Sequence, residues 1–279
     1  METKPIITLL ILGTIIATTS CNKADRDRDY ETLWGLNRPV KSFTVHSYEA
    51  TSKFGEPTKG DLEEVYTVNF NEDGNTESIK KYDPNGDLKE VAKFKYDENG
   101  LRTKQNLYDS DGDPNMTIRY EYEGDKVCKM SIQSDYLNQE VISKWEGDYL
   151  KETETYTDRE FSGSTEYTKQ SKTEAQWTDY DANGGELWEG STTLNDNGRI
   201  IEYRRGEAYY EAKWNKNLPI YLKNAHLEMS TWITFWDSDE DIEYFIEYEY
   251  DSKGNWIKQT VFENEELNPI SISEREINY

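Results

Sequence analysis

The chain has 279 residues, of which 56 are acidic and 32 basic, and its net charge is −24. Such an acidic surface repels the phosphates of nucleic acids, so we do not expect a nucleic-acid partner. Apolar residues make up only 34% of the sequence, whereas aromatic residues reach 13%. Disordered chains are poor in aromatics, and Tyr and Trp among polar residues are typical of strands with one covered face. The composition predicts an ordered, thin or elongated β structure.

The N-terminus has the parts of an export signal. Lys4 is a positive charge, residues 6–17 are an apolar stretch too short to span a membrane, and small residues 18–20 precede Cys21. This arrangement resembles a lipoprotein signal peptide over residues 1–20. The resemblance implies that Cys21 is acylated and attaches the protein to a lipid bilayer. Thr18 departs from the usual aliphatic residue three positions before the cysteine, so an ordinary cleaved signal stays open as the alternative.

The segment after Cys21 is polar and of mixed charge, which predicts a lipidated tether over residues 21–37 and one domain over residues 38–279. We expect the protein at the outer membrane or cell surface, with the leaflet left open. Cys128 is the second cysteine. A disulfide between Cys21 and Cys128 is possible only if Cys21 is not lipidated. A lone cysteine is more often a small buried apolar residue than a nucleophile.

A short repeat runs through the predicted domain. An aromatic residue or Leu is followed by Asp or Asn and, four positions after the aromatic, by Gly. Asp or Asn opens a type I turn by bonding its own backbone, and Gly then takes the left-handed conformation that closes a hairpin. The turn glycines are Gly74, Gly86, Gly100, Gly112, Gly184, Gly198 and Gly254.

Between these turns, apolar and polar residues alternate with a period of two. Every second residue from 242 to 250 is Ile or Tyr, with glutamates at 243, 247 and 249. This period is that of a strand with one covered face. We therefore predict an all-β domain of antiparallel β-hairpin repeats that form an elongated, curled meander, without a long helix after residue 33. Two packed sheets are the alternative.

The Tyr-Asp-x-x-Gly units, above all YDSKGNW at 250–256, resemble the YD repeats of the Rhs family. They resemble more closely the short YD-like repeat lipoproteins of Bacteroidota. The resemblance covers about residues 70–125 and 180–256 and is degraded over 126–176. Rhs proteins use such repeats as a shell around a toxin, but this chain is far too short for that shell. The resemblance therefore implies a fold and not an activity.

Residue types that support catalysis are scarce. The histidines are His46 and His226, and no nucleophile-elbow pattern accompanies either. The sequence has no phosphate-binding glycine loop and no local cluster of zinc ligands, so we expect no cofactor. With 56 acidic residues, a glycosidase pair of carboxylates stays open without being located.

Two acidic runs place carboxylates at alternate positions, as calcium loops do. Pro114 and Ile242 stand where an EF-hand has its Gly, and neither run has Glu at the twelfth position. Plain Asx turns are therefore favoured over calcium sites. The residues concerned are Asp109, Asp111, Asp113, Asp237, Asp239 and Asp241.

Several tryptophans could stack on sugar rings, although cross-strand packing explains most of them better. We hypothesise a non-enzymatic cell-envelope lipoprotein that binds a protein or a glycan through its sheet. A carboxylate-based glycan hydrolase and a purely structural spacer are the alternatives. The candidate tryptophans are Trp145, Trp177, Trp188, Trp214, Trp232, Trp236 and Trp256.

Overall fold

The computed structural model describes residues 29–197, 199–206, 208–215, 218–228, 232–235, 242–264 and 268–279. Helix α2 (Asp29–Thr32) precedes a series of strands. The strands are β1 (Ser42–Lys53), β2 (Glu56–Phe70), β3 (Thr76–Tyr82), β4 (Leu88–Tyr96), β5 (Arg102–Tyr108), β6 (Pro114–Glu123), β7 (Lys126–Ser134), β8 (Asn138–Glu146), β9 (Tyr149–Thr157), β10 (Glu160–Gln170), β11 (Glu174–Asp181), β12 (Glu186–Leu194), β13 (Ile200–Arg205), β14 (Ala208–Asn215), β15 (Leu218–Lys223), β16 (Ala225–Glu228), β17 (Trp232–Phe235), β18 (Glu243–Tyr250), β19 (Trp256–Glu263) and β20 (Asn268–Asn278).

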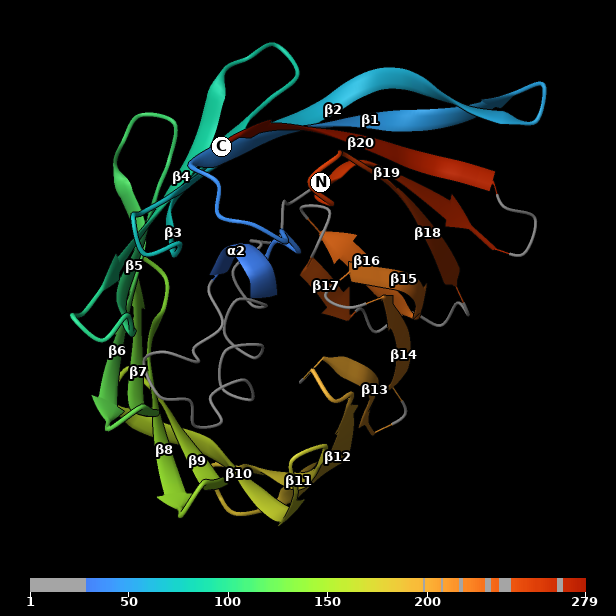
Figure 1. Cartoon of the computed structure of the whole chain (residues 1–279). Coiled ribbons are helices and arrows are strands. Elements are labelled where there is room, and N and C mark those ends of the chain that lie inside the picture. The colour runs from blue at the N-terminus through green and yellow to red at the C-terminus, as the bar shows by residue number, and fades with distance from the viewer. Residues whose placement is uncertain are drawn as a thin grey trace.

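Eighteen strands form one closed antiparallel barrel. Each strand from β1 to β14 pairs with the next one, β15 pairs with β18, and the series continues through β19 to β20. Strand β20 then pairs with β1, which completes the ring. Strands β16 and β17 form a separate hairpin. Figure 1 shows the ring from one end, with α2 and this hairpin inside it.

The predicted all-β antiparallel fold is confirmed, but the elongated curled meander and the alternative of two packed sheets are wrong, because the sheet closes into a barrel. Consecutive strands do pair as in a meander, yet β1 and β20 pair from Ser42↔Asn278 to Glu49↔Ser271. This pairing removes the free edges that an open sheet would expose. Alternation with period two tells which residues share a face, but it does not tell which distant strand covers an edge.

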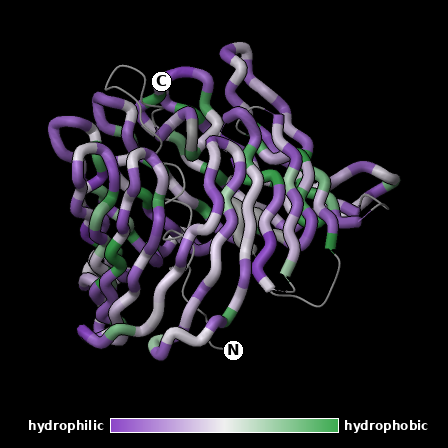
Figure 2. Tube along the Cα trace, turned by 90° about the horizontal axis from the view of Figure 1, so that it is seen from below, coloured by the Kyte–Doolittle hydropathy of each residue, from purple (hydrophilic) through white to green (hydrophobic). Residues whose placement is uncertain are grey.

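The two faces of the barrel wall differ in chemistry. In β6, Ile118 and Tyr120 point into the lumen and are buried, whereas Arg119 and Glu121 point outward and are exposed. Hydrophilic and hydrophobic residues alternate in this way along the strands (Figure 2). A barrel that crosses a bilayer has the opposite arrangement, with an apolar band on its outside.

Among the described residues, no helix is long and apolar enough to cross a membrane.

Residues 29–36, which are helix α2 and the segment after it, pack inside one side of the lumen, and we name them the plug. The Trp34 side chain is fully buried, with its ring centroid 5.2 Å from that of Phe43. Its indole N–H donates to the Thr76 hydroxyl at 3.1 Å. Asp29 accepts hydrogen bonds from the Tyr96 hydroxyl at 2.8 Å and from the Thr76 backbone N–H at 2.9 Å. The packed part of the chain thus includes residues 29–36, which belong to the segment that the sequence analysis assigns to the tether.

The same hairpin turn recurs around the barrel. In each copy the side chain of the opening Asp or Asn accepts the backbone N–H groups two and four residues later, as Asp97 does from Asn99 at 2.9 Å and from Leu101 at 2.8 Å. The glycine of this turn has a φ of 78° at Gly100, and left-handed values are also found at Gly74, Gly86, Gly112, Gly184 and Gly254. Gly198 lies outside the described residues.

Candidate functional site

The lumenal wall over β10–β13 carries a group of polar and aromatic side chains that we name the lumenal patch. Its members lie on one face because direct cross-strand partners share a face. Thr165 pairs with Asp179, and Asp179 pairs with Trp188. The same face continues through Thr153 of β9 to β8, whose Val141 belongs to a buried lumenal cluster. The lumenal patch consists of Thr165, Trp177, Asp179, Trp188, Tyr203 and Arg205.

Asp179 holds the guanidinium of Arg205 in a fixed orientation. Its Oδ2 atom accepts from Nε and Nη2 of Arg205, both at 2.9 Å. Its Oδ1 atom accepts the Thr165 hydroxyl at 2.7 Å. The Asp179 side chain is 12% exposed and that of Arg205 is 46% exposed. The carboxylate is therefore occupied within the wall, while about half of the Arg205 side chain stays open to solvent.

Two glycines allow indole rings to lie against the wall. A Cβ atom at Gly190 would overlap with the Trp177 indole, and one at Gly206 would overlap with the Trp188 indole. Each ring therefore covers a glycine backbone. Trp177 is 8% exposed, whereas Trp188 is 50% exposed. Trp188 thus presents an open aromatic surface beside Arg205.

A row of aromatic rings extends this surface across neighbouring strands. The ring centroids of Tyr167 and Trp177 are 6.2 Å apart, those of Trp177 and Tyr203 are 5.6 Å apart, and those of Tyr203 and Tyr210 are 5.6 Å apart. Burial raises the pKa of Tyr167 to about 12 and also raises the pKa of Tyr203. Both phenols are therefore protonated at neutral pH and can donate as well as accept hydrogen bonds.

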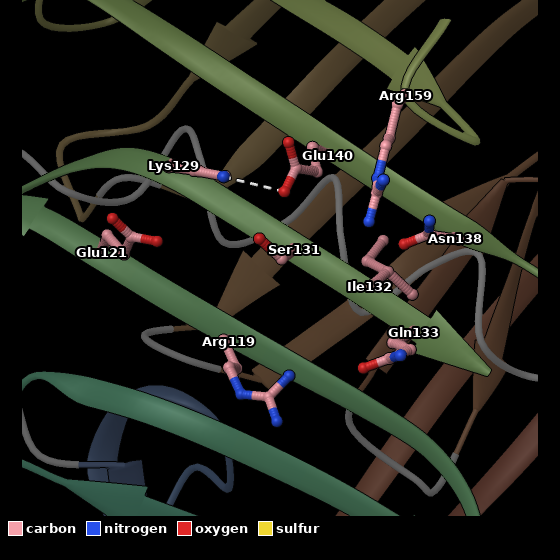
Figure 3. Close-up of a pocket in the computed structure, with 9 residues that line it drawn as sticks. All are labelled: Arg119, Glu121, Lys129, Ser131, Ile132, Gln133, Asn138, Glu140 and Arg159. Atoms are coloured by element: carbon pink, nitrogen blue, oxygen red, sulfur yellow. Dashed lines mark ion pairs between the residues drawn. The ribbon is translucent and has the colours of Figure 1, made fainter.

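The opposite, outer face of the wall has a shallow hollow of about 340 Å³ over β6–β8 (Figure 3). Arg119 of β6 and Arg159 of the turn between β9 and β10 lie on either side of it. Within the hollow, Lys129 Nζ lies 2.8 Å from a carboxylate oxygen of Glu140. In the described part of the chain, neither arginine forms an ion pair with a carboxylate.

The first predicted acidic run is an Asx turn. Asp109 Oδ1 accepts the backbone N–H of Asp111 at 3.0 Å and that of Asp113 at 2.9 Å. Asp237, Asp239, Asp241 and the predicted lipidation site Cys21 lie outside the described residues. The described ranges contain no group of three or more His, Cys, Asp or Glu residues placed to hold a metal ion.

The remaining candidates have separate places in the barrel. Cys128 is a free, partly buried thiol in β7, His46 lies in β1, and His226 lies in β16. Trp232 lies in β17, and Trp236 is outside the described residues.

Three of the candidate tryptophans belong to the structure of the wall. Trp145 donates its indole N–H to the Val127 carbonyl at 2.9 Å, and Trp214 donates to the Ile200 carbonyl at 2.7 Å. Trp256 is fully buried. Of the candidate tryptophans whose side chains the structure describes, Trp177 and Trp188 belong to the lumenal patch. Asp179 and Arg205 are not among the residues predicted from the sequence, although Asp179 lies two residues after Trp177 on the same strand and therefore on the same face.

No protein-family model matches the sequence, and no curated protein is significantly similar to it. Solved structures give loose matches. A porin-like protein from Bacteroides uniformis is 11% identical with a TM-score of 0.40, and the match covers 86% of this chain and 97% of that one. A porin-like protein from Bacteroides vulgatus is 12% identical with a TM-score of 0.33, covering 87% and 99%. The Photorhabdus luminescens Tc holotoxin pore is 12% identical with a TM-score of 0.25, covering 77% of this chain and 14% of that one. Because these TM-scores are low, the matches carry no argument about the fold, which is assigned from the strand pairing of this chain.

Proposed function

We propose that this protein is a non-enzymatic, lipid-anchored protein of the cell envelope that binds a neutral glycan at the lumenal patch. The observation that supports this most strongly is the half-exposed Trp188 indole beside Arg205, which Asp179 holds in place. An aromatic ring packs against the apolar face of a sugar, and a few fixed polar groups bind its hydroxyls. The lumenal patch offers both kinds of group.

The charge of the patch favours a neutral ligand over an anionic one. Asp179 compensates the charge of Arg205 through its two contacts of 2.9 Å. The guanidinium therefore acts as an oriented hydrogen-bond donor rather than as a free cation. The hydroxyls of Tyr167 and Tyr203 add neutral donors and acceptors nearby.

The carboxylates of the patch favour binding over hydrolysis. A glycosidase uses two free carboxyl groups that are about 5–9.5 Å apart. Both oxygens of Asp179 accept hydrogen bonds from Thr165 and Arg205. Asp181, two residues further along β11, uses Oδ1 to accept the N–H groups of Asn183 and Gly185 in the turn, each at 2.8 Å. Both carboxylates are therefore engaged in hydrogen bonds within the protein, which argues against the hydrolase alternative.

Attachment to the outer membrane through acylated Cys21 is part of the proposal, as is the likeness to YD-like repeat lipoproteins. Outward positions of the described wall carry charged residues such as Arg119 and Glu121. The lipid anchor, rather than the barrel wall, would therefore attach the protein to the membrane. Residues 22–28 separate Cys21 from Asp29. An extended chain spans at most about 3.6 Å per residue, so Asp29 would lie within roughly 30 Å of the bilayer.

Glycan binding is tested with the mature domain on an array of neutral oligosaccharides, followed by affinity electrophoresis in gels that contain the matching soluble polysaccharide. We expect at least one neutral glycan to retard the protein and Trp188→Ala to remove the retardation. Tyr149→Ala is the matched control, since Tyr149 is 51% exposed and lies outside the patch. Equal retardation of wild type and Trp188→Ala, or no binding across the array, would contradict the proposal.

The anchor has its own test, which is membrane fractionation with intact-mass measurement of the mature protein. We expect Cys21→Ser to release the protein from the membrane or to leave it unprocessed. A wild-type mass without lipid would refute the anchor and leave the glycan proposal standing.

A further inference from the structure

The outer wall over β3–β6 carries a set of cations that the strongly negative total charge conceals. Lys95 pairs directly with Lys104, and Lys104 pairs directly with Arg119. Direct cross-strand partners have Cβ atoms about 5 Å apart. The register therefore sets three cations side by side across three adjacent strands. The sequence shows no run of basic residues here, because the three positions are separated along the chain.

Two further lysines extend this set toward β3. Lys80 and Lys93 are exposed on the same outer face, at positions that alternate with the lumenal Ile79 and Ala92. The ammonium group of Lys93 lies 5.0 Å from the ring centroid of Tyr108. We name Lys80, Lys93, Lys95, Lys104 and Arg119 together the cationic strip.

The cations of the strip have no counter-ions within the described protein. No ion pair within 4.0 Å joins any of the five to a described carboxylate. By contrast, other outward lysines are paired, as Lys59 is with Glu274 at 2.8 Å and Lys169 with Glu174 at 3.1 Å. Glu121 follows Arg119 on the same face of β6 and stands opposite Lys129 in the register, but Lys129 forms its ion pair with Glu140, and no ion pair within 4.0 Å joins Glu121 to Arg119.

Folding alone does not account for this arrangement. Like charges directly opposite one another destabilise a sheet. The chain has 56 acidic residues, any of which could have been placed in these rows. The like-charged pairs of the strip therefore lower the stability of the sheet, and an anion bound from solution would neutralise them.

The hollow of Figure 3 lies at the end of the strip. Arg119 belongs to both, and Arg159 lies across the hollow from it. Ser131, which pairs with Arg119 across strands, and Gln133 line the floor. The hollow thus adds a second unpaired guanidinium and uncharged hydrogen-bonding groups to the row of cations.

We infer that the cationic strip and the hollow form a binding site for a linear acidic polysaccharide. Acidic groups along the chain lie over Lys95, Lys104 and Arg119, and one carboxylate or sulfate enters the hollow between Arg119 and Arg159. Neighbouring strands are about 4.8 Å apart, which is comparable to the length of one sugar residue along an extended chain. Ser78 is the cross-strand partner of Lys93 and Ser131 that of Arg119, so their hydroxyls are placed to bind sugar hydroxyls beside the cations.

The shape and charge of the site favour a polysaccharide over the other polyanions. The strip crosses the strands and therefore follows the convex circumference of the barrel, where a flat bilayer would touch few of its members. Double-stranded DNA carries one charge per about 1.7 Å, so the net charge of −24 repels it strongly. A polysaccharide with about one charge per sugar experiences less of this repulsion.

The site is on the opposite face of the wall from the lumenal patch, so the two proposals can fail independently. The test measures binding of the mature domain to polygalacturonate and to heparin at low and high salt. The strip variant is Lys95→Ser/Lys104→Ser/Arg119→Ser. The control is Lys59→Ser/Lys169→Ser/Lys213→Ser, which removes the same number of exposed cations from three existing ion pairs.

We expect wild type to bind at least one of the two polymers in a salt-sensitive way. The strip variant should bind at least tenfold more weakly, the control within twofold of wild type, and Trp188→Ala like wild type. Melting temperature verifies that the strip variant is folded, and it should be no lower than that of wild type. Arg159→Gln, which alters only the hollow, should weaken binding by a few-fold.

Three results would overturn the inference. One is the absence of binding to both polymers at low salt. The second is equal weakening by the strip variant and the control. The third is tighter binding of wild type to duplex DNA or to phosphatidylglycerol vesicles than to either polysaccharide.

Discussion

Two parts of the lumen both contain tryptophan and arginine, but these side chains are enclosed in one part and partly exposed in the other. Near α2, Trp34 is fully buried against Phe43 and Tyr66, and its indole N–H is bonded to Thr76. In the lumenal patch, Trp188 is 50% exposed. A tryptophan that is enclosed on all sides contributes its whole apolar area to stability. One that is half open keeps a surface with which a ligand can pack.

The arginines of the two parts differ in the same way. Arg275 is 4% exposed, and its guanidinium carbon lies 3.4 Å from the ring centroid of Trp256 and 4.3 Å from that of Phe43. It donates to the Trp34 carbonyl at 3.2 Å, and burial lowers its pKa to about 9. Arg275 thus ties the plug to β20 through the Trp34 carbonyl, while its guanidinium stacks on the ring faces of Trp256 and Phe43 in the wall. Arg205 is instead held by a carboxylate at one side and open at the other.

The largest expected effect is on the plugged side. Trp34→Ala removes a fully buried indole and its hydrogen bond to Thr76, so we expect the free energy of unfolding to fall by about 3–5 kcal/mol. Trp188→Ala should cost about 1 kcal/mol, because half of that side chain is already in solvent. Guanidinium denaturation of both variants checks the contrast, and equal losses would show that the two regions do not differ as described.

The next effect concerns the polar contacts of Asp29, which attach the plug to the barrel wall. Asp29 accepts from the Thr76 N–H and lies 3.4 Å from Nη2 of the largely buried Arg102, and Asp29→Ala leaves both donors without this partner. The Tyr96 hydroxyl, which also bonds Asp29, keeps the Thr76 carbonyl as an acceptor at 2.8 Å. Donors that lose a buried partner cost about 1–3 kcal/mol each, so we expect a total loss of about 2–3 kcal/mol. Asp73→Ala is the control, since Asp73 is exposed in a neighbouring turn. A denaturant midpoint of Asp29→Ala equal to that of Asp73→Ala would show that the contacts of Asp29 do not stabilise the barrel.

A smaller effect is expected at the turns, which both parts of the ring share. Gly100 has a φ of 78°, and Gly100→Val should cost about 1–2 kcal/mol because a β-branched residue disfavours the left-handed conformation. Gly86→Val should cost the same, since a Cβ atom at Gly86 meets nothing within 4 Å and the penalty resides in the backbone. Denaturant midpoints measure both variants. Unchanged midpoints would mean that the turns adapt without strain.

The turns and strands could be predicted because their signals are local. Asp97 and Gly100 are close in sequence, and together they specify the hydrogen bonds and the backbone conformation of one hairpin. Ring closure could not be predicted in this way. It depends on contacts such as that between the hydroxyls of Ser47 and Ser273, which are 226 positions apart. The role of Trp34 was missed for a similar reason, because a short polar segment gives no sign of the lumen that receives it.

The candidate sites show the same limit. Trp177 and Trp188 could be listed from residue type alone. The pairing of Asp179 with Arg205 depends on the register of β11, β12 and β13 together. The cationic strip likewise exists only once β4, β5 and β6 are in register, which is why total charge alone gave no sign of a basic surface.

The central claim is that the lumenal patch, and not the plugged side, meets the ligand. Fluorine NMR of protein labelled with 5-fluorotryptophan tests it directly, with each resonance assigned by a Trp→Phe variant. During titration with the neutral glycan selected on the array, the Trp188 resonance should shift and that of Trp177 should follow, while those of the buried Trp34 and Trp256 stay in place. A Trp188 resonance that does not move at saturating glycan would contradict the account.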